Sequence, residues 1–110
     1  MSKSKVVTGK EIFARRLRAA RALTQLSQRK LGIEAGMDEF TASVRVNQYE
    51  QAVHMPDYAT AVSLAAALGV PTAYLYSDDD LIAELLLSAG GLGTKARKAL
   101  IAQLQSDREP

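Results

Sequence analysis

Apolar residues recur every three or four positions along most of this chain, the spacing at which side chains share one face of a helix. Residues that begin or end helices interrupt this pattern repeatedly. The segments between the interruptions are about residues 9–23, 28–35, 42–51, 58–68 and 71–76. The sequence therefore predicts an all-α fold in which five helices form a bundle.

Two of these segments have clear apolar faces. The predicted core face of the first segment consists of Ile12, Phe13, Leu17 and Ala20. In the fourth segment, Asp57 is expected to cap the N-terminus and Gly69 to end the helix. Its predicted core residues are Val62, Leu64, Ala65 and Leu68. Pro71 suits the first turn of the short fifth helix.

The segment from Leu26 to Pro56 is the most informative, because it predicts two short helices joined by a turn. Ser27 is a favourable N-cap for the first of them, and Gln28 is its first helical residue. Gly36 follows this helix, where a left-handed cap favours glycine. Gly32 has no side chain, so another helix can approach closely there.

On the second of these helices, Val46 and Tyr49 share one face. Two helices crossed through a small residue and a glycine turn form the helix-turn-helix, whose second helix enters the major groove of DNA. Over about residues 9–76 the chain resembles the Cro/lambda-repressor type of regulator, the XRE family. The residues that carry this resemblance are Ser27, Gln28, Leu31, Gly36, Val46, Tyr49, Glu50, Leu64, Ala65, Ala67, Leu68, Gly69 and Val70.

The chain departs from the family pattern at three places. Gly32 replaces the usual alanine of the first of the two helices. Residues 38–41 look like an inserted turn, which shifts the start of the predicted recognition helix. After Glu50 the family usually has a basic residue and glycine, whereas this chain has the sequence Gln-Ala-Val-His at 51–54.

The resemblance implies a lambda-repressor-like DNA-binding bundle, so we expect base contacts from the N-terminal half of the third helix. Ser43, Val44 and Gln48 would point toward base edges. Gln48 can pair with adenine, and Val44 can pack on a thymine methyl group. Arg45 would reach a phosphate or, in a shifted register, a guanine. The alternative for each is a solvated residue on an exposed helix face.

Phosphate contacts are expected from Gln28, where free backbone N–H groups at a helix N-terminus favour an anion. The candidates beside it are Arg29, Thr41 and Asn47, with His54 and Tyr58 for the far strand. A single histidine in a loop is more often only solvated. The resemblance also implies a partly buried ion pair between Arg21 and Glu50, which would lock the third helix onto the first.

Charge is distributed unevenly, although the formal net charge is only +2. Residues 1–30 contain nine basic residues and one acidic residue, and residues 31–110 contain five and eleven. A basic N-terminal third fits a surface that faces phosphates, and a solvated helix face is the alternative. Residues 1–8 are predicted to be a flexible basic arm, which either reaches along a DNA groove or is an inert tail.

Residues 78–110 are predicted to form a helical extension to the helix-turn-helix domain of residues 9–77. Three aspartates at 78–80 suit the start of a helix over 81–90, and glycines at 90, 91 and 93 then break the chain. Thr94 is expected to cap a last helix with Leu100, Ile101 and Leu104 on one side. The apolar residues of the first extension helix are Leu81, Ile82, Leu85, Leu86 and Leu87. They either pack onto the bundle or form a homodimer interface, and we favour the dimer.

Composition excludes several classes of function. The chain has no cysteine, so a disulfide framework and a thiolate metal site are ruled out. No apolar run approaches the ~18 residues of a membrane span, and the N-terminus lacks a signal-peptide core, so we expect a cytoplasmic protein. With one histidine and no phosphate-binding glycine loop, no enzyme activity, cofactor or metal is expected. The residues after the bundle are too few for a domain that senses a small-molecule effector.

These features predict a regulator of transcription that binds double-stranded DNA sequence-specifically. We expect a repressor that binds a two-fold symmetric operator as a dimer. One alternative is the antitoxin and autoregulator of a toxin–antitoxin pair, which uses the same fold. The other is a protein-interaction module that reuses the bundle without binding DNA.

Overall fold

A computed structural model describes residues 7–108, so most of the predicted arm, residues 1–6, lies outside the described range. Within that range the chain forms six α-helices and one 3-10 helix, and no strand. The elements are α1 (Gly9–Ala22), α2 (Gln28–Glu34), α3 (Ala42–Glu50), α4 (Tyr58–Leu68), the 3-10 helix η1 (Thr72–Tyr76), α5 (Asp80–Gly90) and α6 (Thr94–Ser106). The predicted all-α fold is therefore confirmed, and the segment after Pro71 is a 3-10 helix.

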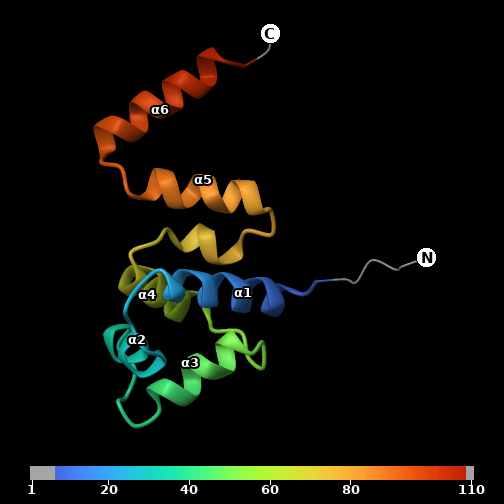
Figure 1. Ribbon diagram of the computed structural model, residues 1–110, viewed down its shortest axis with the longest axis vertical. Helices are drawn as coiled ribbons and strands as arrows, with labels where there is room; N and C mark the ends of the chain where they lie inside the picture. The colour runs from blue at the N-terminus through green and yellow to red at the C-terminus, as the bar shows by residue number, and fades with distance from the viewer. Residues whose placement is uncertain (1–6, 109–110) are drawn as a thin grey trace, which may run out of the picture.

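The elements are stacked along the long axis of the molecule, which measures 53 × 45 × 23 Å (Figure 1). α2 and α3 form one end, and α1 and α4 lie next to them. η1 separates this group from α5, and α6 lies at the opposite end of the molecule. The two helices of the C-terminal extension are thus far from α3.

Side chains from the first four helices and η1 meet in one core. Burial of this apolar surface is the main favourable term in folding. The largest fully buried apolar side chains are Phe13, Leu17, Leu31, Val46, Leu64 and Leu75. One predicted core residue is wrong, because Val62 is exposed. The core face of α4 begins at Ala61, and each helical residue is rotated by about 100° from the one before it, so Val62 points outward.

Most helix starts follow the local signals in the sequence. The side chains of Ser27 and Asp57 accept hydrogen bonds from the N–H groups of Lys30 and Thr60, as expected for N-caps. The prediction that Thr94 caps α6 is wrong. The residue before it, Gly93, already has the extended N-cap conformation, so Thr94 is the first helical residue and no side chain caps this helix.

The crossing of α2 and α3 depends on a glycine. A methyl group added at Gly32 would lie 2.6 Å from the Cβ of Ala42 and 3.1 Å from its backbone. Real Cβ atoms essentially never approach another atom to 2.6 Å, so the first residue of α3 can pack here only because Gly32 has no side chain.

We predict that Gly32→Ala destabilises the protein by about 1–3 kcal/mol, because the added methyl group overpacks the contact with Ala42. Gly9→Ala is the matched control, since a methyl group there meets nothing within 4 Å. Urea unfolding followed by circular dichroism measures both. Equal stability of the two variants would contradict a close approach of Ala42 to Gly32.

Candidate nucleic-acid interface

The chain reverses direction between α2 and α3 in a turn that hydrogen bonds stabilise. Gly36 has a φ of +93°, in the left-handed region that favours glycine. The Asp38 carboxylate accepts a hydrogen bond of 2.7 Å from the N–H of Phe40. The Asp38 carbonyl accepts from the N–H groups of Thr41 and Ala42. Residues 38–41 therefore form a turn that fixes where α3 begins.

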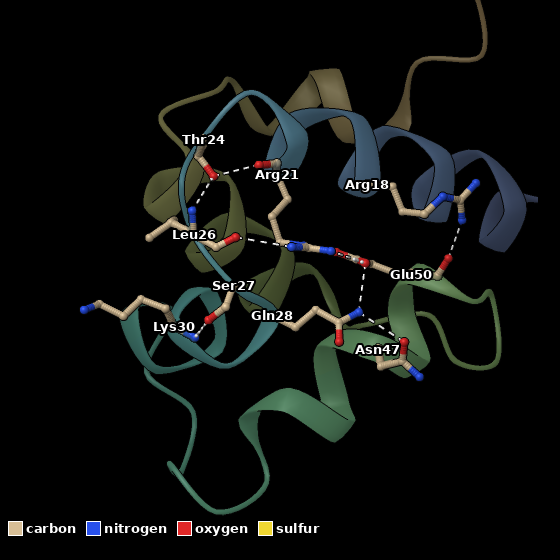
Figure 2. Close-up of polar contacts among 9 residues, drawn as sticks. All are labelled: Arg18, Arg21, Thr24, Leu26, Ser27, Gln28, Lys30, Asn47 and Glu50. Atoms are coloured by element: carbon tan, nitrogen blue, oxygen red, sulfur yellow. Dashed lines mark hydrogen bonds and ion pairs between the residues drawn. The ribbon is translucent and has the colours of Figure 1, made fainter.

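An ion pair with two hydrogen bonds attaches α3 to α1. Arg21 donates from Nε to Oε2 of Glu50 at 2.6 Å and from Nη2 to Oε1 at 3.0 Å (Figure 2). The Glu50 side chain is 2% exposed and that of Arg21 is 27% exposed. The hydrogen bond to Glu50 raises the pKa of Arg21 and outweighs the opposing effect of burial. The ion pair implied by the family resemblance is thus present, with its carboxylate buried.

Gln28 joins the same carboxylate from α2. Its side-chain amide donates to Oε1 of Glu50 at 2.9 Å and to Oδ1 of Asn47 at 3.1 Å (Figure 2). Arg18 donates to the backbone carbonyl of Glu50. The end of α3 is therefore held by side chains from α1 and α2 together. The sequence pattern gave no signal for the contacts of Gln28 and Arg18 to Glu50.

The predicted base-contacting residues lie on the surface of α3. Val46 and Tyr49 are buried as predicted, and Ser43 and Val44 are exposed. Gln48 is partly exposed beside them. Arg45 differs, because its Nη2 donates to the hydroxyl of Tyr49 at 3.1 Å and its guanidinium lies along the helix.

The predicted phosphate contacts fall into two groups. The first group lies around the α2–α3 crossing and consists of Gln28, Arg29, Thr41 and Asn47. Within it, Arg29 lies 3.8 Å from the Glu39 carboxylate of the turn. The second group follows α3 and consists of His54 and Tyr58, which are both exposed. The ring of Tyr58 stacks on that of Tyr76, with 6.5 Å between centroids.

The basic residues of the N-terminal third do not all face solvent. Arg16 is buried and donates from Nε to the carbonyl of Ser77 at 2.8 Å. Its Nη2 lies 3.0 Å from a carboxylate oxygen of Asp80. Arg16 and Arg21 therefore have partners within the protein. Fewer of the basic residues of the N-terminal third are available for phosphates than the sequence suggests.

Residues 7–108 contain neither a candidate metal site nor a candidate membrane-spanning helix. No group of three or more His, Cys, Asp or Glu side chains in this range could hold a metal ion. No helix in the same range is both long and apolar enough to cross a membrane.

Comparison with solved structures finds a similar transcriptional regulator. No protein-family model matches the chain, and no curated protein matches it. Among solved structures, the crystal structure of transcriptional regulator BswR is similar, with 44% sequence identity and a TM-score of 0.77. The match covers 84% of this chain and 92% of the BswR chain.

We predict that Arg21→Ala destabilises the protein by about 3 kcal/mol, because it leaves the buried Glu50 carboxylate without its cationic partner. Arg29→Ala is the matched control, since its ion pair with Glu39 is exposed and should contribute less than about 1 kcal/mol. Thermal unfolding measures both. A loss from Arg21→Ala no larger than that from Arg29→Ala would contradict a stabilising role for the buried pair.

Proposed function

This chain belongs to the family of transcriptional regulators that includes BswR, and from this premise we propose that it is a sequence-specific DNA-binding regulator. We assign it to the helix-turn-helix regulators of the XRE type, with α2 and α3 as the two helices of the motif. The observation that carries the proposal is the outward face of α3, which is held in place by the buried Glu50 network. A helix fixed at that end presents its side chains in one orientation to a DNA groove.

In the proposed complex α3 lies in the major groove. Gln48 would form two hydrogen bonds with an adenine, and Val44 would pack on a thymine methyl group. Ser43 would contact a base edge near the start of the helix. Arg45 would reach a phosphate or a guanine after leaving Tyr49. These residues carry the sequence preference.

Phosphate contacts would set the position of the protein on the duplex. Gln28, Arg29 and Asn47 would contact one strand beside the α2–α3 crossing, and Thr41 would contact it at the turn. His54 and Tyr58 would reach the other strand. The exposed positions of Arg29 and Tyr58 support this assignment.

We propose that α5 and α6 form a homodimer interface. α6 buries no residue, although an isolated helix of this length is only marginally stable in water. The apolar side chains exposed on the two helices and their connection are Leu81, Ile82, Leu85, Leu92, Ile101 and Leu104. A second copy would cover them and place two reading helices on a two-fold symmetric operator. Such a cytoplasmic repressor would act by blocking polymerase.

Two other functions compete with this one. A protein-interaction module is favoured by the acidic turn, because Glu39 neutralises part of the charge of Arg29. An antitoxin of a toxin–antitoxin pair is favoured by the apolar surface of α5 and α6, which a toxin could cover. A DNA affinity that falls with added salt would support a regulator over a protein-interaction module. Isolation of a bound toxin would identify an antitoxin.

We predict that the protein binds duplex DNA from a random pool at ~50 mM salt, with an affinity that falls steeply as salt increases. Fluorescence anisotropy measures the affinity, and sequencing of the bound DNA reveals the enriched site. Gln48→Ala should weaken binding to that site by about 1–3 kcal/mol and leave non-specific binding unchanged. Gln105→Ala on α6 is the control. Absence of any binding at low salt would contradict the proposed function as a DNA-binding regulator.

We predict that Leu81→Lys converts a dimer to a monomer without unfolding it, because Leu81 is 76% exposed within one copy. Leu23→Lys is the matched control, since Leu23 is equally exposed but lies at the end of α1. Light scattering after size-exclusion chromatography gives the mass of each variant. A wild-type monomer at high concentration would rule out this interface.

A further inference from the structure

An exposed aromatic side chain stands next to the start of α3. Phe40 is 86% exposed, although a phenylalanine side chain gains about 1.5–3 kcal/mol by full burial. Val44, which is 58% exposed, follows it four residues later. A single exposed apolar residue is ordinary, but both of these lie in or just before the N-terminal half of α3, the part proposed to meet DNA, which indicates a contact surface.

The helical register places Phe40 on the outward side of α3. The N–H of Ala42 donates to the carbonyl of Asp38, so the last residues of the turn already follow the helical path. Positions four residues apart share one face, which aligns Phe40 with Val44. The buried side of α3 carries Ala42 and Val46 instead. Phe40 therefore lies two residues before the first helical residue and four residues, about one turn, before Val44.

The turn holds Phe40 in place. Its own N–H is bonded to the Asp38 carboxylate at 2.7 Å. The neighbouring Glu39 lies 3.8 Å from Arg29, which connects the turn to α2. The backbone at Phe40 is therefore already ordered, so binding has to order only the side chain.

We propose that Phe40 and Val44 together form an apolar clamp that reads the 5-methyl groups of thymines in the major groove. This inference rests on the proposed function, and it names a specificity residue of the same site. The N-terminal end of a recognition helix is the part that contacts base edges, and Phe40 lies immediately before that end. In the major groove the methyl group of thymine is the apolar feature of the base edges, and phenylalanine is among the side chains that pack on it.

Exposed basic residues at the start of α2 suit DNA as the occupant of the clamp, although Glu39 neutralises part of the charge of Arg29. Arg29 and Lys30, at the start of α2, are both exposed, and the Arg29 guanidinium lies 3.8 Å from Glu39 of the turn. Their guanidinium and ammonium groups suit the phosphates that border a groove, and the apolar pair would then lie between the phosphate rows. Asp38 is directed to the backbone of Phe40, so its charge is partly satisfied within the turn.

Replacing thymine by deoxyuridine tests the clamp, because it removes only the methyl group and keeps every hydrogen bond of the base. The probe is the duplex that wild-type protein enriches from a random pool, remade with each thymine replaced in turn. At the contacted position wild-type protein should bind about fourfold more weakly, which corresponds to ~0.8 kcal/mol for one buried methyl group. Phe40→Ala, which keeps Val44, should reduce this difference, and the double variant with Val44→Ala should bind the thymine and deoxyuridine duplexes equally at that position. Phe40→Leu should keep part of the difference.

Three controls separate this effect from others. Val62→Ala removes an exposed valine from α4 and should leave the thymine preference unchanged. Phe40→Ala should keep the salt dependence of the wild type, because no phosphate contact is lost. Its melting temperature should also be unchanged, because the ring is exposed.

Each outcome decides the proposal. Equal wild-type affinity for all thymine and deoxyuridine duplexes would overturn the clamp and leave the regulator intact. A thymine preference that is undiminished in Phe40→Ala would also overturn it. Enrichment of no duplex at all would overturn the proposed function, and the clamp with it. A change in the oligomeric mass of Phe40→Ala with unaltered thymine preference would reassign the ring to a protein contact.

Discussion

The Glu50 carboxylate is the contact on which the arrangement of the first three helices depends. It is buried and accepts two hydrogen bonds from Arg21 on α1 and one from Gln28 on α2. A buried carboxylate without partners would be strongly destabilising, so α3 is stable here only while both neighbours are in place. Because the contact lies at the C-terminal end of α3, it fixes the rotation of the helix. The same rotation determines which side chains point outward.

A second constraint fixes the other end of α3. Gly32 and Ala42 approach so closely that no side chain fits at the glycine, and the bonded turn at Asp38 sets where the helix begins. α3 is therefore held at both ends, with its middle free of the core on one side. This combination suits the reading role proposed for α3, because sequence discrimination depends on side chains whose positions are already set before binding.

Two arginine side chains set the arrangement of the C-terminal extension, one joining it to the bundle and the other joining its two helices. Arg16 on α1 bonds the carbonyl of Ser77 and the carboxylate of Asp80, and so sets the start of α5 relative to α1. Arg97 on α6 donates to the carbonyls of Ala89 and Gly90 at the end of α5. If α5 and α6 hold two copies together, as proposed, these contacts transmit the geometry of the dimer to the spacing of the two reading helices.

The sequence by itself determined the helices, because the signals that start and stop them act within a few residues. Ser27 and Asp57 cap helices as expected, and Gly69 has the left-handed conformation that ends α4. The ion pair of Arg21 with Glu50 followed from family resemblance. Only the tertiary structure decided which residues meet across helices. It turned Val62 outward, buried the Arg16 guanidinium and exposed Phe40, since these outcomes depend on helix rotation and on partners distant in sequence.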